Sequence, residues 1–227
     1  MMRLRPRALV VAYALALLAA PVPAEQLRAV VRDSAGKPLP NAVVVAAPKN
    51  GKGPPARPAI EVVDQIDKEF VPYVKAVRVG TQVQFPNKDN IRHHVYSFSP
   101  AKKFELPLYR GTPAQPVLFD KVGVVKLGCN IHDWMLAYVY VTDAPYFGKT
   151  TGDGRVDLDG LPRGAYRVWT WHPRMTGMEA DTVREIDLQG TASLEWKLLC
   201  LTHNLLKLFR SGAAAWARSR VPALATA

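Results

Sequence analysis

Residues 123–141 decide the fold, and they read GVVKLGCNIHDWMLAYVYV. Two β-type runs, 123–127 and 136–141, flank a short loop that holds the pattern Cys-x-x-His-x-x-Met. Short runs rich in Val, Leu and Tyr on either side of a compact loop are typical of neighbouring strands in an all-β domain. The loop therefore places three kinds of metal-ligating side chain between two predicted strands.

The three ligand types are the Cys129 thiolate, the His132 imidazole and the Met135 thioether. With a second imidazole they would form the trigonal His2Cys set with a weak axial Met that holds type 1 copper. His93 or His94 supplies that imidazole, and only one of the two can face the metal because side chains alternate along a strand. Each of these residues taken singly is more often core or surface than ligand. Zinc is the rival metal because it also accepts thiolate and imidazole, but the thioether favours copper.

Short β-type runs separated by Pro, Gly and Asn continue through most of the chain and predict a Greek-key sandwich or barrel, without a helix of ordinary length. Turn chemistry lies at 33–38, 151–154 and 161–164. Residues 104–111 are the least regular piece and are expected to form a loop that covers one edge. The other predicted strands are 27–32, 42–46, 60–64, 76–79, 81–85, 94–98, 117–119, 155–158, 165–171, 183–188 and 193–198.

The region 61–142 resembles the cupredoxins, the small blue copper proteins. One His followed by Cys-x-x-His-x-x-Met is closest to the amicyanin-like branch, and the segments around 104–109 and 128–135 look typical of the cupredoxin-like "methylamine utilization protein" group. The family also has an Asn six residues before its first His, as Asn87 is here, but His94 stands where it usually has another Asn. The resemblance implies four copper ligands: His93 as upstream imidazole, Cys129 as thiolate, His132 as second imidazole and Met135 as axial thioether.

The two flanks, 27–46 and 150–168, look like the opening and the later strands of a carboxypeptidase-regulatory-like β-sandwich. The resemblance implies one small sandwich that is interrupted by the copper-binding domain. The predicted fold class is therefore all-β, a cupredoxin Greek-key sandwich combined with a small Ig-like, carboxypeptidase-regulatory-like sandwich. The predicted segments are a signal peptide at 1–24, first strands and a Pro-rich linker at 25–58, the cupredoxin domain at 59–143, the remaining strands at 144–197 and a basic Leu- and Ala-rich tail at 198–227.

The first 24 residues have the form of a bacterial export signal. Arg3, Arg5 and Arg7 precede an apolar run at 8–20, and small residues follow up to Ala24. The run is short for a membrane span, so cleavage after Ala24 and a periplasmic location are predicted. A retained N-terminal anchor is the alternative.

The formal net charge of +11 lies mostly at the two ends of the chain. From Glu25 to Trp196 there are 22 Lys and Arg against 19 Asp and Glu, so no nucleic-acid partner is expected.

The tail after Trp196 is open to three interpretations: a basic amphipathic helix at a membrane surface, a frayed terminus, or a non-native reading frame. No stable membrane insertion is expected after signal cleavage. A Cys129–Cys200 disulfide is the less favoured alternative, because Cys129 lies within the ligand spacing.

These features predict a periplasmic type 1 copper protein that cycles between Cu(I) and Cu(II) and carries single electrons between redox protein partners. We expect no enzyme, since five histidines without a His-Cys-His triplet are too few for a multicopper oxidase and no Ser-His-Asp, Walker or paired-carboxylate motif is present. The alternatives are a copper-trafficking or storage protein, and a β module whose copper site has decayed; the intact ligands argue against the latter. His172 is expected as a strand-end residue, and His203 has no assigned role. The link to methylamine is only a name carried by the resemblance.

The expected electron port is the surface around His132, Asp133 and Trp134, with Met135 beneath it. A ligand in a short loop turns one imidazole edge to solvent, and an adjacent indole provides an apolar contact that a transient partner can use. The alternative is that Trp134 packs inward against the flanking sandwich.

Overall fold

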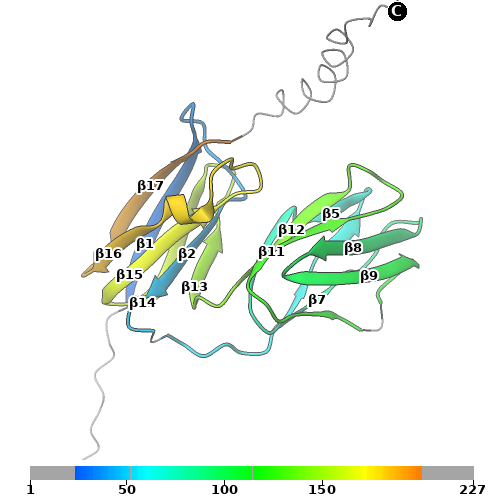
Figure 1. Ribbon diagram of the computed structural model, residues 1–227, viewed down its shortest axis with the longest axis horizontal. Coiled ribbons are helices and arrows are strands. Elements are labelled where there is room, and N and C mark those ends of the chain that lie inside the picture. The colour runs from blue at the N-terminus through cyan, green and yellow to red at the C-terminus, as the bar shows by residue number, and fades with distance from the viewer. Residues whose placement is uncertain (1–23, 52, 114, 201–227) are drawn as a thin grey trace, which may run out of the picture.

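The structure, a computed structural model, describes residues 24–200 except 52 and 114, and this part of the chain is all-β, as predicted. Figure 1 shows two β-sandwiches side by side, the first on the left and the second on the right. The predicted signal up to residue 23 and the predicted tail from residue 201 lie outside the described residues. Within them the one helical element is the 3-10 turn η1 (Glu179–Thr182), and no helix there has the length and apolarity needed to cross a membrane.

The first sandwich is built from strands at both ends of the described chain, because β1 and β2 precede the second sandwich in sequence and β13 to β17 follow it. Its two sheets enclose a core that includes Leu27, Val44, Leu161 and Trp196. One sheet has the order β14 (Arg155–Pro162), β1 (Ala24–Asp33), β17 (Ala192–Leu198), and the other the order β13 (Tyr146–Lys149), β2 (Val43–Pro48), β15 (Gly164–Trp171), β16 (Arg184–Leu188). The predicted domain limits themselves stay a prediction.

The second sandwich carries all four predicted copper ligands. Its core is separate from that of the first and includes Phe85, Val95, Leu127 and Val139. The larger sheet has the order β6 (Val74–Arg78), β12 (Leu136–Thr142), β11 (Gly123–Gly128), β8 (His93–Ser99), β9 (Lys102–Tyr109). The smaller sheet has the order β10 (Val117–Phe119), β7 (Thr81–Gln84), β3 (Ile60–Val62). A separate hairpin is formed by β4 (Asp64–Ile66) and β5 (Glu69–Val71).

The prediction of a loop at 104–111 is wrong, because most of this segment belongs to the edge strand β9. Phe104 and Leu106 pack against the core, as alternate residues of a strand do. Pro107 and Leu108 together oppose the single residue His94, so the proline lies at a bulge on an edge strand, where a missing N–H costs no ladder bond. A loop over an edge was expected, whereas the segment itself forms the edge strand.

Two expected turns have different outcomes. At 151–154, Gly154 donates its N–H to the Thr151 carbonyl at 2.9 Å and has φ +75°, so the predicted turn is confirmed. A Cβ at Gly154 would lie 2.5 Å from the Val31 carbonyl oxygen, which requires glycine there. At 161–164, β14 continues to Pro162 and only Arg163 separates it from β15, so the turn is shorter than predicted.

The two sandwiches meet over a third apolar cluster that contains Val43 and Val45 of β2, Val74 of β6 and Tyr140 of β12. Alternation along β12 explains this position, since its neighbours Ala137, Val139 and Val141 point into the second core while Tyr138 and Tyr140 face the first sandwich. One strand therefore serves both the core beneath the ligand loop and the interface.

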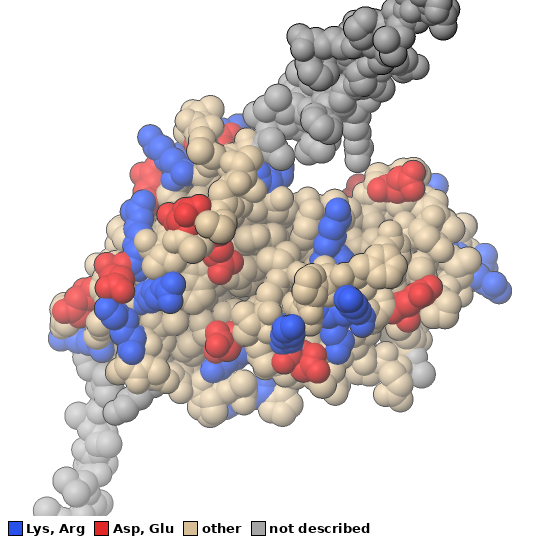
Figure 2. Space-filling view, in the orientation of Figure 1, with Lys and Arg blue, Asp and Glu red and all other residues tan. Residues whose placement is uncertain are grey.

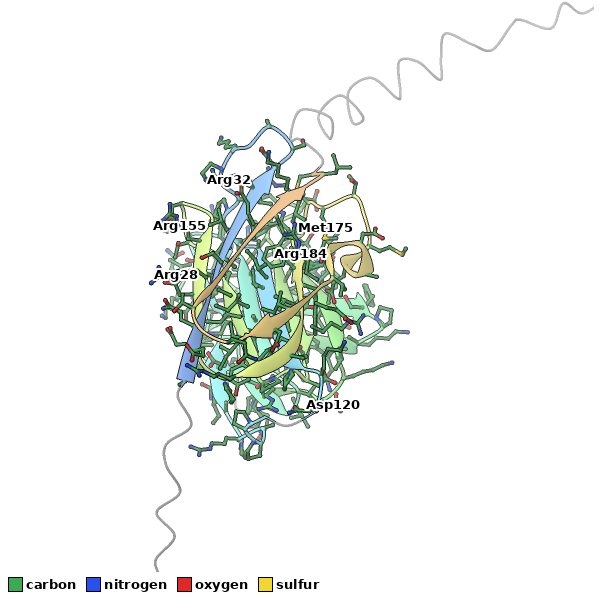
Figure 3. The ribbon with its side chains drawn as sticks, turned by 90° about the vertical axis from the view of Figure 1, so that its left-hand side faces the viewer. Arg28, Arg32, Asp120, Arg155, Met175 and Arg184 are labelled. Carbon is green, nitrogen blue, oxygen red and sulfur yellow. The ribbon has the colours of Figure 1, made fainter. Side chains whose placement is uncertain are left out.

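Charges of both signs are interspersed over the face of the molecule seen in Figure 2. Figure 3 shows Arg28, Arg32 and Arg155 on one outer sheet of the first sandwich. Arg32 pairs with Glu195 at 3.0 Å, and Arg28 lies opposite Asp157 in the β1–β14 register. Arg28 and Arg32 thus each have an acidic neighbour on this sheet.

Candidate metal centre

Three of the four predicted ligands come together at one end of the second sandwich. One ligand atom from each of His93, Cys129 and His132 lies within 4.8 Å of the others. The Cys129 Sγ and His132 Nδ1 atoms are 3.9 Å apart, and the His93 and His132 ring centroids are 5.0 Å apart. His93 begins β8, Cys129 directly follows β11, and His132 lies in the loop before β12.

The loop after β11 is a tight turn that returns the chain to the core. Met135 donates its N–H to the His132 carbonyl at 3.0 Å. As a result Met135 is only 2% exposed and Cys129 only 4%, and both belong to the same core cluster. At the start of the loop the Tyr96 ring lies over Gly128, where a Cβ would be 2.8 Å from Tyr96 Cζ. This close packing fixes the backbone immediately before the thiol.

His93 and His94 face opposite sides of β8, as strand alternation requires. His93 is fully buried, and its Nε2 lies 2.6 Å from Asp89 Oδ2. His94 turns away from the cluster: its Nε2 lies 2.9 Å from Glu105 Oε1 and its ring is 5.3 Å from the Tyr96 ring. The structure thus brings His93, and not His94, to Cys129.

The donor atoms at the cluster fit a soft metal ion. The His93 Nδ1 is buried without a hydrogen-bond partner among the described residues, although an unpartnered buried polar atom is costly. The same is true of His94 Nδ1, but His94 has no part in the cluster. Partial burial is the largest cause that lowers the pKa of His132, which favours the neutral imidazole that can ligate a metal. Two imidazoles, a thiol and a nearby thioether form the set that suits copper.

A frame of hydrogen bonds behind His93 holds the loop between β7 and β8. Asn87 donates its Nδ2 hydrogens to the Ile91 and Tyr109 carbonyls, each at 2.8 Å, and its N–H to the Gly111 carbonyl at 2.8 Å. Asp89 donates its N–H to Asn87 Oδ1 at 3.0 Å. In the sequence, Asn87 was notable only by its spacing to His93, and Asp89 had no predicted role, since a four-residue spacing in a loop does not specify a contact.

The mouth of the site carries exposed apolar side chains. Trp134 is 65% exposed, with its ring 5.1 Å from that of His132, and Ile131 is 47% exposed. The alternative in which Trp134 packs inward is therefore wrong. His132 is half-buried, so it is the cluster residue that reaches the surface.

The other residues considered as ligands or as a disulfide lie elsewhere. Cys129 and Cys200 are both free thiols. His172 donates from Nε2 to the Pro40 carbonyl at 3.1 Å, and its Nδ1 accepts the Arg174 N–H at 3.1 Å, so both ring nitrogens are satisfied at the end of β15. His203 lies outside the described residues.

Comparison with known proteins adds structural likenesses but no family. No protein-family model and no curated protein matches the chain. A mutant of amicyanin with Cu(I) is 22% identical, at a TM-score of 0.33 over 37% of this chain and 82% of that one. A purple cupredoxin from Nitrosopumilus maritimus is 23% identical, at a TM-score of 0.32 over 37% and 99%. A Cu-containing nitrite reductase from Thermus scotoductus is 24% identical, at a TM-score of 0.35 over 40% and 24%. At such identities and TM-scores the likeness carries no conclusion about activity.

Proposed function

We propose that this chain is a periplasmic type 1 copper protein that carries single electrons between redox protein partners and is not itself an enzyme. The observation that supports this most is the buried cluster of His93, Cys129 and His132, in which a buried imidazole nitrogen lacks any other partner among the described residues. The predicted export signal is the basis for the location.

The residues of the site would have separate roles in binding copper and in excluding water. His93, Cys129 and His132, together with the Met135 thioether, would hold copper. Copper, when bound, supplies a one-electron couple, and a ligand set acceptable to both oxidation states keeps the rearrangement per electron small. Burial of Cys129 and Met135 keeps water from the sulfur side, and the strands on either side of the loop hold the donors in place.

His132 provides the route for the electron. It is the half-buried ligand, and it lies against the exposed indole of Trp134. An apolar, readily desolvated contact suits a partner that must bind and leave quickly. Charges of both signs are interspersed on the face seen in Figure 2, which supports a protein partner over a polyanion.

The decisive experiment is to load the copper-free protein with Cu(II), record its visible spectrum and measure its reduction midpoint. An intense thiolate-to-copper band with reversible cycling is the expected result. Cys129→Ser should abolish the band while the far-UV circular dichroism is unchanged, because serine is a hard, weakly ionised replacement for the thiolate.

A variant that stays blue would refute the ligand assignment. Tight copper binding with no reversible couple would instead favour trafficking or storage.

A further inference from the structure

Asp89 is fixed more tightly than a loop carboxylate usually is. Its Oδ2 lies 2.6 Å from His93 Nε2, where the imidazole is fully buried and the Asp89 side chain is 13% exposed. Oδ1 accepts the Asp67 N–H at 2.7 Å, and Oδ2 also accepts the Lys68 N–H at 2.9 Å. A carboxylate that already receives two backbone N–H groups is held as a hydrogen-bond acceptor toward His93 as well.

This acceptor determines which nitrogen of His93 carries the proton. A neutral imidazole has one N–H and one lone pair, so an acceptor at Nε2 requires the proton there and leaves the lone pair on Nδ1. Nδ1 is the atom that is buried without a partner among the described residues, and His93 lies with Cys129 and His132. The contact therefore presents a ready lone pair before any metal arrives.

The two backbone donors come from the tip of the β4–β5 hairpin. Asp67 and Lys68 have φ of +53° and +61°, in the left-handed region that only a minority of non-glycine residues adopt. Both N–H groups point at the same carboxylate. Asp89 thus joins this hairpin tip to His93.

We propose that Asp89 is a positioning residue for the metal site: it fixes the tautomer of His93 and, by strengthening the imidazole as a donor, favours Cu(II) over Cu(I). This rests on the proposed function for the metal and for its redox role. A carboxylate on the far nitrogen of a ligating histidine raises the basicity of that ligand, and loss of such a partner costs about 10–100-fold in metal affinity. His132 has no carboxylate within hydrogen-bond distance among the described residues. The two imidazoles therefore differ, because only that of His93 has a carboxylate partner.

The test compares Asp89→Asn with Asp133→Asn. Asparagine has one carbonyl oxygen in place of two carboxylate oxygens, so it cannot accept from Asp67, Lys68 and His93 together. Asp133→Asn removes the same charge from an exposed residue next to His132, with no hydrogen bond to a ligand ring among the described residues. It therefore measures the effect of charge alone.

The first measurement uses copper-free protein. Long-range 1H–15N spectra should show His93 in the Nε2–H form in the unmodified protein and in Asp133→Asn, and a mixture of tautomers in Asp89→Asn. A His93 proton on Nδ1 in the unmodified protein would overturn the inference without any variant, and this holds even if Asp89→Asn does not fold.

The second measurement is the affinity for each oxidation state and the reduction midpoint. In Asp89→Asn we expect about tenfold weaker Cu(II) binding with Cu(I) binding little changed, which corresponds to a midpoint about 59 mV higher for one electron. A shift no larger than that of Asp133→Asn would overturn the proposed preference for Cu(II). If the unmodified protein shows no copper couple, the proposed function fails, and the tautomer measurement still decides the role of Asp89.

Discussion

The Tyr140 hydroxyl makes two hydrogen bonds between the two sandwiches, and Tyr140→Phe tests how much they stabilise the fold. The Tyr140 hydroxyl donates to Glu179 Oε2 at 2.7 Å and accepts the Trp169 indole N–H at 3.0 Å. Phenylalanine keeps the ring, which lies 5.4 Å from that of Trp171, so the apolar contact is retained. A hydrogen bond to a charged group contributes about 1.5–3 kcal/mol, and a neutral one about 0.5–1.5 kcal/mol. Removal of both should lower the free energy of unfolding by about 2–4 kcal/mol.

Urea unfolding of the copper-free protein, followed by tryptophan fluorescence and by far-UV circular dichroism, measures this change. Tyr146→Phe is the matched control, because the Tyr146 hydroxyl makes no hydrogen bond to another described residue, and its cost should stay within about 0.5 kcal/mol. If Tyr140→Phe costs no more than Tyr146→Phe, the three-residue network does not stabilise the interface.

Three further outcomes follow from the same geometry. His93→Ala should lose copper, whereas His94→Ala should retain it, because only His93 lies in the cluster; equilibrium dialysis checks this, and copper loss from His94→Ala alone would mean that the ligand is misassigned. Trp134→Ala should slow electron self-exchange with an unchanged visible spectrum, and an unchanged rate would place electron entry elsewhere. Burial raises the pKa of Glu179, so the folded state binds its proton more tightly than the unfolded state does. Stability should therefore fall as pH rises from the ordinary glutamate pKa through the raised one, and this dependence should be absent in Glu179→Gln; parallel pH profiles for the two proteins would contradict it.

The ligand loop could be read from the sequence because its signals are local. Cys129, His132 and Met135 lie within seven residues between two runs with strand character, so few folds could separate them. The choice of His93 over His94 needed only strand alternation and an expected ligand interval, and the structure places the two rings on opposite faces.

Edge strand β9 was missed because a proline interrupts its pattern. Phe104 and Leu106 alternate with polar residues, which is a strand signal, but Pro107 argues against a central strand. The proline is tolerated because it lies at a bulge opposite His94. Whether a strand lies at an edge depends on the sheet order, which a local pattern does not contain.

Asp89 could not be assigned from the sequence for a related reason. Its four-residue spacing to His93 specifies a contact in a helix but not in a loop, and its two backbone donors come from a hairpin more than twenty residues earlier. That hairpin turns on Asp67 and Lys68, whereas a tight turn of this kind is usually signalled by Asn-Gly or Asp-Gly. A lysine with positive φ costs free energy and persists only where its surroundings hold it, and here the Asp89 carboxylate accepts the N–H groups of both residues at the tip. The unfavourable backbone and the buried imidazole thus have one common partner, and the two features are evident only together in the folded chain.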